Sequence, residues 1–440
     1  MRYGRRPPCR CRIRFGSRDG RPNGHRLETV TPRALLARAR HLVTCQSQSH
    51  QNGITFEDLG WHSPGAVLAV DGRISYAGSV SGLNATIVPP DVREIDAGNA
   101  VIVPGFVDAH SHPLYAGNRE PDFSAGVRGQ KAPLGMLYTV RETRRALESQ
   151  SGRQAFWQTA RARMHTMLRH GTTTLEVKTG YALHKDGEVQ LLDLIQTHRQ
   201  DPDVPALIAT VLGAHALPPE YVSEEVFVEY LIGHLLPVAK AHGAVYADAF
   251  CEPGFFAPDL TRRYLEAARA CGLRLRCHCD EMAYGGAARM AADLGVDAID
   301  HANCITSQDV AAIAERGIIA VACPATIAYL NLPQRAPVRA LLDAGASVAL
   351  ASDYNPGTSP CFNLQTVAYL GRSLFGLSAA EALYGVTRAA ARSLRADAGQ
   401  IAAGASADFV VLQIESPQEF GWQFGGNLAQ LVVHAGRIYE

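Results

Sequence analysis

Short apolar runs rich in β-branched residues recur along the middle of the chain, and amphipathic stretches separate most of them. Helical patterns such as the one from Thr261 to Ala270 fill these intervals. The apolar runs lie at 102–109, 172–178, 207–214, 244–251, 273–279, 297–302, 318–323 and 346–352. Eight strand–helix units of this kind predict an α/β fold, specifically a (β/α)8 TIM-like barrel.

The two ends of the chain have a different, β-rich pattern. Residues 65–78 predict a hairpin with an Asp-Gly turn, and residues 408–412 and 431–439 have the same strand character. Because the helix-rich sequence lies between these ends, we expect them to pair into one small, discontinuous β-sandwich domain. The predicted domain limits are 33–100 and 391–440 for the two parts of the small domain and 101–390 for the barrel.

Residues 1–32 stand apart from both patterns. They contain nine arginines against one aspartate and one glutamate, with Pro and Gly and no helical or strand period. This composition predicts a disordered basic extension. The segment lacks the apolar core of a secretory signal and the amphipathic pattern of a transit peptide. An over-extended gene start is the interpretation we favour, and whether these residues are genuinely translated stays open.

Composition narrows the class of protein. The 440 residues are 47% hydrophobic and carry 42 basic and 42 acidic side chains, with no apolar run long enough to span a bilayer. We therefore expect a soluble cytoplasmic protein with a small-molecule partner, and neither nucleic acid nor membrane. The ten cysteines stand mostly inside predicted strands and helices, which favours free thiols. Cys277 and Cys279 flank His278, but on a strand they face the opposite side and are expected to pack.

A histidine pair follows the first apolar run. Residues 100–108 have a strand pattern, and His110 and His112 come directly after it. Because residues i and i+2 on a strand point to the same face, both imidazoles can reach one ion. Among 16 histidines a few would stand at strand ends by chance, yet the pairing favours a metal site.

Three further metal-competent side chains, His278, His301 and Asp353, follow later runs. Catalytic groups of such barrels lie at the carboxyl ends of the strands. Histidines with an aspartate suit zinc or iron and can leave a position open for water. The run that ends at Glu252 has no lysine that could bridge two ions, and Lys178 lies on the second strand. One divalent or trivalent ion is expected, and its identity stays open between zinc and iron.

Glu281, His301 and Asp353 are the candidates for proton transfer. Glu281 lies three residues beyond His278, near enough to move protons between water and a leaving nitrogen, and its alternative is a surface ion pair. His301 can bind the metal, polarise a carbonyl or stabilise an oxyanion, and we assign it to catalysis before ligation. For Asp353 we favour a role as ligand or general base over that of a loop cap.

Longer segments extend these observations. They are 105–112 with 117–119, 175–181, 212–221, 278–281, 352–360 and 424–427. From about residue 60 to its end, the chain resembles the amidohydrolase superfamily and, more narrowly, the imidazolonepropionase family. That resemblance implies a metal held by His110, His112, His278 and Asp353. It also implies a substrate pocket lined by Arg119, Tyr181, His215, Glu281, Asn355, Gly357 and Thr358.

The reaction implied by the resemblance opens the ring of 4-imidazolone-5-propanoate to N-formimidoyl-L-glutamate in histidine degradation. Metal-activated water would attack the cyclic amide carbonyl, with Glu281, His301 and Asp353 handling protons. Arg119 would grip the carboxylate arm of the substrate bidentately. Relatives commonly pair as homodimers, so we expect the same here.

One segment departs from the family pattern, and it keeps alternatives open. Residues 126–136 are shorter than the family's tyrosine-bearing turn and glycine run. A changed pocket mouth could admit a related ring, such as a thiohydantoin or hydantoin propanoate. A nucleobase-type aminohydrolase shares the metal motif, although Arg119, Tyr181 and His215 argue against it. A noncatalytic binding barrel is disfavoured because all four expected ligands are present.

Overall fold

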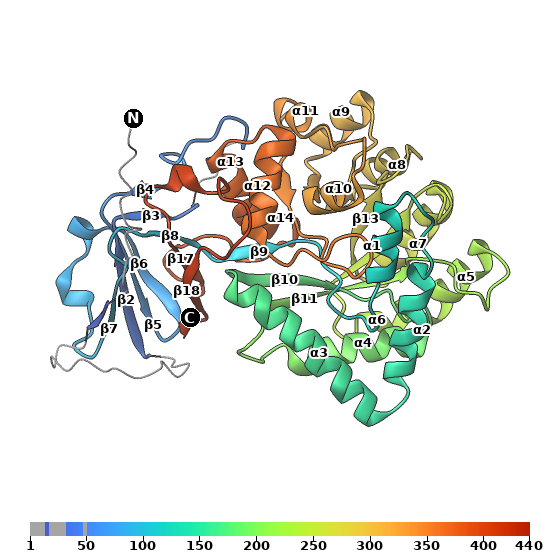
Figure 1. Ribbon diagram of the computed structural model, residues 1–440, viewed down its shortest axis with the longest axis horizontal. Coiled ribbons are helices and arrows are strands. Elements are labelled where there is room, and N and C mark those ends of the chain that lie inside the picture. The colour runs from blue at the N-terminus through green and yellow to red at the C-terminus, as the bar shows by residue number, and fades with distance from the viewer. Residues whose placement is uncertain (1–13, 17–31, 47–50) are drawn as a thin grey trace.

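Eight parallel strands form the barrel predicted for the middle of the chain (Figure 1). The computed structural model describes residues 14–16, 32–46 and 51–440. In barrel order the strands are β9 (Phe106–Asp108), β10 (Thr172–Lys178), β11 (Ala206–Ala214), β12 (Tyr246–Cys251), β13 (Arg274–Cys279), β14 (Ala298–His301), β15 (Ile319–Ala322) and β16 (Val348–Leu350). Beyond the last strand, the Asp353 amide donates to the His110 carbonyl at 3.0 Å, which joins β16 to β9. The predicted fold class is confirmed.

Helices cover the outside of the barrel (Figure 1). They are α1 (Glu120–Val127), α2 (Gly135–Leu147), α3 (Gln150–Arg169), α4 (Lys185–His198), α5 (Glu224–Tyr230), α6 (Leu236–Ala239), α7 (Pro258–Ala270), α8 (Ala287–Leu294), α9 (Ser307–Arg316), α10 (Pro324–Leu330), α11 (Val338–Asp343), α12 (Leu364–Phe375), α13 (Ala379–Tyr384) and α14 (Ala390–Ser393). Local chemistry sets their ends. Thr306 and Asp309 form a capping box at the start of α9, and Gly317 ends it in the left-handed conformation.

Two further sheets form the small domain, and both ends of the chain contribute to it (Figure 1). One sheet has the order β1 (Arg14–Gly16), β7 (Arg93–Asp96), β2 (Ala34–Ala39), β5 (Gly65–Val70) and β6 (Arg73–Ser79). The other has the order β19 (Arg437–Tyr439), β18 (Ala429–His434), β17 (Phe409–Leu412), β8 (Val101–Pro104), β3 (His41–Val43) and β4 (Trp61–His62). Leu35 and Val67 of the first sheet share one apolar core with Phe409 and Val433 of the second. This is the expected β-sandwich.

The predicted hairpin is present as β5 and β6, which pair antiparallel. Its turn residues Asp71 and Gly72 both have positive φ, 51° and 75°, which is the geometry that an Asp-Gly turn favours between two strands. The domain limits given above for the barrel and for the two parts of the small domain stay predictions.

Two details differ from the sequence-based expectations. The run at 102–109 is not one strand, because the chain breaks at Gly105 and passes from β8 in the small domain to β9 in the barrel. A Cβ at Gly105 would lie 2.1 Å from Oγ1 of Thr173, so only glycine fits this crossing. The expectation that 1–32 has no regular structure is wrong at Arg14–Gly16, which pairs antiparallel with β7. The rest of that prediction, for 1–13 and 17–31, lies outside the described residues.

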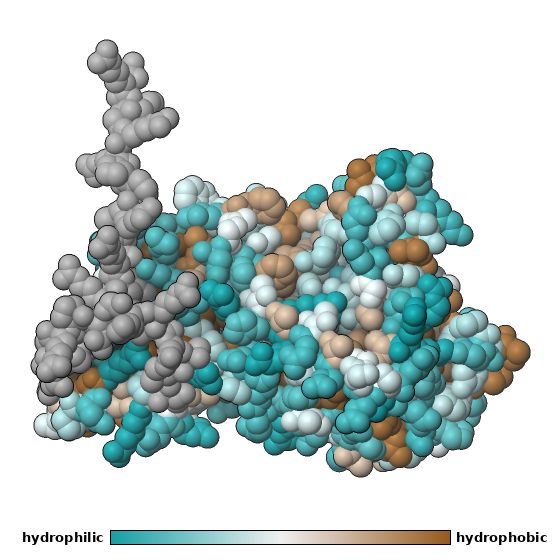
Figure 2. Space-filling model, turned by 60° about the horizontal axis from the view of Figure 1, so that its bottom comes forward, coloured by the Kyte–Doolittle hydropathy of each residue, from teal (hydrophilic) through white to brown (hydrophobic). Residues whose placement is uncertain are grey.

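The surface is largely hydrophilic on the face shown in Figure 2, with apolar residues scattered among polar ones. Within the described part of the chain, no helix combines the length and the apolar character needed to cross a membrane. Eight of the ten cysteines are described, and all eight are free thiols.

Candidate metal centre and active site

The carboxyl ends of four barrel strands bring the predicted ligands together. His110 and His112 follow β9, His278 lies within β13, His301 ends β14 and Asp353 follows β16. The ring centroids of His110 and His278 are 4.5 Å apart, and those of His110 and His112 are 5.2 Å apart. All five side chains are buried, with at most 3% of their surface exposed. The strand-end arrangement expected from the sequence is therefore the arrangement in the fold.

Distances between the donor atoms fit a single small cation. Nε2 of His110 lies 3.2 Å from Nε2 of His112 and 3.3 Å from Oδ1 of Asp353, and the remaining separation, His112 to Asp353, is 3.5 Å. Ligands of a tetrahedral zinc ion stand about 3.3 Å apart, given zinc–nitrogen bonds of about 2.0–2.1 Å. One donor atom from each of His110, His112 and His278 also lies within 4.8 Å of the others. The residues present fit one borderline divalent ion.

Two carboxylates orient the ligand histidines from behind. Oδ2 of Asp300 lies 3.0 Å from Nδ1 of His110, and Oδ2 of Asp248 lies 2.9 Å from Nδ1 of His278. A carboxylate at Nδ1 fixes the tautomer and directs the Nε2 lone pair toward a metal. Asp248 and Asp300 were not singled out from the sequence. The available signal was a charged residue inside an otherwise apolar strand pattern.

The two carboxylates belong to a group of charged side chains that we call the buried charge layer: Glu176, Lys178, Asp248, Arg276 and Asp300. All five are fully buried. The Lys178 ammonium donates to Asp248 at 2.6 Å, to Glu176 at 3.0 Å and to Asp300 at 3.2 Å. The Arg276 guanidinium donates to the other oxygen of Asp300 at 2.7 Å. One lysine thus contacts both carboxylates that orient ligand histidines.

Electrostatics keep this layer charged. Burial lowers the pKa of Lys178, but Asp248, Asp300 and Glu176 outweigh that effect and raise it above its ordinary value. Burial raises the pKa of Asp300, but Arg276 and Lys178 outweigh it and hold that pKa well below the ordinary value. Opposite charges in contact therefore stabilise the ionised forms on both sides.

The three proton-transfer candidates form a second group beside the ligands. One donor atom from each of Glu281, His301 and Asp353 lies within 4.8 Å of the others, and Nε2 of His301 is 3.7 Å from Oε2 of Glu281. Burial, then the charges of Asp353 and Glu252, hold the pKa of Glu281 well above its ordinary value. Burial raises the pKa of Asp353, but the hydrogen bond with His110, the charges of His301 and His110 and the hydrogen bond with Thr326 together outweigh burial and bring that pKa to about 2.

His301 differs from both carboxyl groups. Burial, reinforced by His110 and His278, lowers the pKa of His301 to about 3, so its imidazole is neutral at physiological pH. Its backbone has φ of 68°, and Asp353 has φ of 48°. Left-handed conformations are uncommon outside glycine and concentrate at functional sites, where the surrounding structure holds them. The strand ends therefore fix both side chains in unusual backbone geometry.

Arg119 lies at the predicted substrate side of the site and is held in place. Its Nε donates to Oδ2 of Asp122 at 2.7 Å. Asp122 also accepts from the backbone amides of Leu134 and Gly135 at the start of α2. A Cβ at residue 357 would lie 2.0 Å from Nη1 of Arg119, so Gly357 leaves the space that the guanidinium occupies.

The other predicted pocket residues divide into two sets. Tyr181 and His215 stand beside the ligands, and the His215 ring stacks on His112 with centroids 5.4 Å apart and an angle of 16°. Asn355 and Thr358 instead bond to each other in the loop after Asp353. Oδ1 of Asn355 accepts from the amides of residues 357 and 358 at 2.8 and 2.7 Å. Asn355 therefore braces the loop that carries Asp353 and faces Arg119.

Two residues near the ligands were missed by the sequence analysis. The hydroxyl of Thr326 donates a hydrogen bond to Oδ2 of Asp353 at 2.6 Å. The other carboxylate oxygen of Asp353, Oδ1, faces Nε2 of His110. Cys323 follows β15, and its thiol lies within 4.8 Å of a ring nitrogen of His110 and one of His301. Cys323 ends the apolar run at 318–323 and Thr326 follows it, and catalytic groups lie at the carboxyl ends of barrel strands. Their position at the end of that run was the signal that could have identified them.

The chain is similar to known proteins over most of its length. A model described as "Amidohydrolase family" matches residues 125–438. An imidazolonepropionase from Anaeromyxobacter dehalogenans is 36% identical over 414 residues, covering 92% of this chain and 95% of that protein. Another, from Parabacteroides distasonis, is 33% identical over 419 residues and covers 92% and 98%. The crystal structure of an atrazine chlorohydrolase from Arthrobacter aurescens complexed with zinc matches with a TM-score of 0.65 at 18% identity, covering 92% of this chain and 94% of that one.

The 18% identity of the zinc-containing structure supports the fold alone. The two relatives carry more weight, because their similarity extends over nearly the whole of both chains. Their likeness includes the barrel and both parts of the small domain. The chain belongs to the imidazolonepropionase family of amidohydrolases.

Proposed function

We propose that this protein hydrolyses the ring of 4-imidazolone-5-propanoate to N-formimidoyl-L-glutamate, a step of histidine degradation. The observation that carries the proposal is the convergence of His110, His112, His278 and Asp353 on one cation-sized centre beside Glu281. Similarity to imidazolonepropionases over nearly the full chain supports the substrate class. Arg119, held by Asp122 next to the loop that carries Asp353, supplies a cation for the carboxylate arm.

The proposed cofactor is one divalent ion per chain, zinc or iron, with His110, His112, His278 and Asp353 as its ligands. When bound, such an ion supplies the Lewis acidity that makes water a nucleophile at neutral pH. The carboxylates Asp248 and Asp300 hold the Nδ1 side of two ligand histidines, so their Nε2 lone pairs face the ion.

The proposed division of proton transfer follows from the opposite pKa shifts of the two carboxyl groups. Asp353, with a pKa of about 2, is ionised and accepts the proton of the attacking water. Glu281, whose pKa is raised well above its ordinary value, is the group that delivers a proton to the leaving ring nitrogen. The oxygen of water bonds to the ring carbonyl carbon, and the bond from that carbon to nitrogen breaks. The proton taken up by Asp353 then passes to Glu281, which returns both carboxyl groups to their starting states.

His301 contributes as a neutral hydrogen-bond donor in this scheme. Its pKa of about 3 keeps the imidazole uncharged. The ring centroids of His301 and His110 are 5.1 Å apart. A neutral donor can stabilise the negative charge that develops on the carbonyl oxygen. Tyr181, tilted against His112, and His215, stacked on it, contact the imidazolone ring in the same proposal.

Two finer expectations also belong here. We propose that the protein works in the cytoplasm and forms a homodimer, as expected from its composition and its relatives. Light scattering of the purified protein tests the second point, since a mass equal to one chain would contradict it.

The test of the proposed function is incubation of metal-replete protein with 4-imidazolone-5-propanoate. We expect loss of ring absorbance and a product whose mass is that of the substrate plus one water, without ammonia. Parallel incubation with the thiohydantoin and hydantoin propanoates measures selectivity. Turnover of only those rings, or release of ammonia from a nucleobase, would overturn the proposed substrate.

A further inference from the structure

The carboxyl end of the fourth barrel strand holds a buried carboxylate that the proposed proton transfers do not use. Glu252 follows β12 and is 3% exposed. Its Oε2 accepts from the backbone amide of Glu281 at 2.8 Å. Its Oε1 accepts from the amides of Met282 and Ala283 at 3.0 and 2.8 Å. Both oxygens of one side chain thus bind three consecutive amides, the first of which belongs to Glu281.

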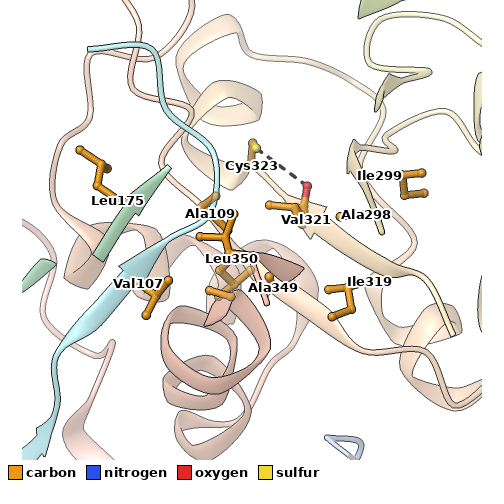
Figure 3. Packing of buried hydrophobic residues seen from close by; sticks show 14 of the residues in the cluster. Val107, Ala109, Leu175, Ala298, Ile299, Ile319, Val321, Cys323, Ala349 and Leu350 are labelled. Carbon is orange, nitrogen blue, oxygen red and sulfur yellow. Dashed lines mark hydrogen bonds between the residues drawn. The ribbon is translucent and has the colours of Figure 1, made fainter. Parts of the chain in front are cut away.

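A second contact holds the carbonyl side of the same residue. Asn303 is buried and comes two residues after β14, and its Nδ2 donates to the carbonyl oxygen of Glu281 at 3.1 Å. Apolar packing fixes β14 itself, since Ala298 and Ile299 lie in the same buried cluster as Val321 of β15 (Figure 3). The amide and the carbonyl of Glu281 are therefore held from two different strand ends.

The carboxyl group of Glu281 has little else to fix it. Nε2 of His301 lies 3.7 Å from its Oε2, which is longer than a hydrogen bond. Among the described residues, no side chain donates a hydrogen bond to this carboxyl group. The chain also turns sharply just before it, because Asp280 has a left-handed φ of 48°. The direction in which the Glu281 side chain leaves the backbone therefore depends on the contacts with Glu252 and Asn303.

We propose that Glu252 is a positioning residue for Glu281: it holds the amides of residues 281–283 so that the Glu281 carboxyl group faces the ring nitrogen that leaves. This inference rests on the proposed function, in which Glu281 delivers a proton to that nitrogen. Proton transfer needs donor and acceptor within hydrogen-bond reach, and a small misplacement of a reacting group is costly. Because backbone amides use both of its oxygens, Glu252 acts through the backbone of Glu281.

Glu252→Gln tests this role. Glutamine has the same size, but one of the two oxygens becomes an NH2 group, which cannot accept from a backbone N–H. At least one of the three amides then loses its partner. We expect kcat to fall by about 10–100-fold, with KM within about twofold of the parent value and the metal content unchanged. Steady-state kinetics on 4-imidazolone-5-propanoate and elemental analysis measure these quantities. A rise in KM at constant kcat would overturn the inference.

A double-mutant cycle separates positioning of Glu281 from general damage to the site. If Glu252 acts through the Glu281 carboxyl group, Glu252→Gln should change kcat by about twofold or less in a Glu281→Gln background. The same 10–100-fold loss in both backgrounds would contradict the inference. Glu252→Asp keeps both acceptor oxygens on a side chain shorter by one methylene. It replaces Glu252→Gln in the cycle if that variant does not fold.

Glu188→Gln is the matched control. Glu188 is fully buried, and its carboxylate accepts from three backbone amides at 2.8 Å, those of Gly180, Ala182 and Leu183. This variant loses comparable contacts, but in the loop that carries Tyr181. Its effect on kcat is therefore expected to be the same, within about twofold, in the parent and in Glu281→Gln. A Glu188→Gln effect that disappears in Glu281→Gln would overturn the inference, because the cycle would then not be specific to Glu252.

Hydrogen exchange followed by mass spectrometry tests the same contact without turnover. Amides that lose a buried acceptor exchange faster, so a peptide that spans residues 281–283 should exchange faster in Glu252→Gln than in the parent protein. A peptide that spans residues 180–183 should not change. Equal exchange of the first peptide in both proteins would overturn the inference. Absence of turnover in the parent protein would instead count against the proposed function, because exchange decides the Glu252 contact independently.

Discussion

The small domain and the interior of the barrel are both buried, but they are built from opposite chemistry. The core between the two sheets of the small domain consists of Leu, Val, Ile, Ala and Phe side chains. The barrel interior, at the carboxyl ends of its strands, instead holds the fully buried charges of Glu176, Lys178, Asp248, Arg276 and Asp300. An apolar core stabilises the fold by removing hydrocarbon from water. Buried charges do not stabilise a fold more than hydrophobic residues of similar volume would.

The difference therefore points to function rather than to stability. The buried charge layer contacts the Nδ1 atoms of His110 and His278 through Asp300 and Asp248. These contacts hold the two imidazole rings so that their Nε2 atoms face the proposed metal position. Among the described residues of the small domain, none contacts these Nδ1 atoms, so a substitution there is not expected to change their positions. Variants in the two regions should accordingly separate loss of stability from loss of metal binding and turnover.

The largest expected effect lies at Glu281. Glu281→Gln keeps the size of the side chain but removes its transferable proton. We expect kcat to fall by about 10²–10⁴-fold, as for loss of a general acid, while the metal content stays unchanged. His301→Ala is expected to lose much of kcat as well and also to retain metal. The control is Glu229→Gln, an exposed carboxylate paired with Arg263, which should leave kcat unchanged. Near-normal turnover of Glu281→Gln would remove it from the scheme.

Lys178→Met gives the next largest effect and compares the two regions directly. It leaves Asp248 and Asp300 without their shared cation, so we expect a loss of about 3–5 kcal/mol in unfolding free energy. Metal affinity should fall by about 10–100-fold, because the carboxylates then lose their fixed positions. Phe409→Ala in the small domain is the matched variant, with an expected loss of about 3–5 kcal/mol and unchanged metal affinity. Denaturant unfolding and equilibrium dialysis measure the two quantities. Equal loss of metal affinity in both variants would erase the proposed distinction.

Arg119→Met tests the substrate side of the barrel face. Loss of a charged hydrogen-bond donor to a carboxylate costs about 1.5–3 kcal/mol, so KM should rise by about 10–100-fold. The metal content and most of kcat should remain, since Arg119 contacts Asp122 and lies against Gly357 rather than the ligands. Steady-state kinetics measure the split. A fall in kcat at constant KM would assign Arg119 to the chemical step instead.

The smallest expected effect concerns Asp122, which links Arg119 to the start of α2. Burial raises the pKa of Asp122, but the amides of Leu134 and Gly135 and the Arg119 guanidinium outweigh it and lower that pKa. A lowered folded-state pKa contributes stability above the unfolded value of about 4, and that stability is lost as pH falls through the folded value. Asp122→Asn should therefore be less stable than the parent at pH 7 by about 1 kcal/mol. The gap should close on acidification. A gap independent of pH would show that charge is not its origin.

Much of the barrel was predictable from the sequence because each strand is a short apolar run flanked by helical periodicity. The same reasoning placed His110, His112, His278 and Asp353 at one edge, since parallel strands end together. It did not detect the break at Gly105, because an apolar run looks the same whether it crosses one sheet or two. The close approach of Thr173 that requires this glycine is a tertiary contact.

The less predictable part of the site consists of residues that act through others. Asp248, Asp300 and Arg276 stand inside strands, and their partners lie on other strands, as Lys178 of β10 does for Asp248 and Asp300. Asn355 is predicted to line the pocket, which stays a prediction, and its polar atoms also hold the loop after Asp353. Such roles depend on distances between separate elements, which periodicity does not contain.

Metal content measured together with turnover tests the central claim most directly. Purified protein is assayed on 4-imidazolone-5-propanoate before and after dialysis against a strong chelator, with bound zinc and iron counted by elemental analysis. We expect one ion per chain in the active protein, loss of turnover with loss of the ion, and recovery when zinc or iron is restored. Full turnover by protein that contains no metal would contradict the account.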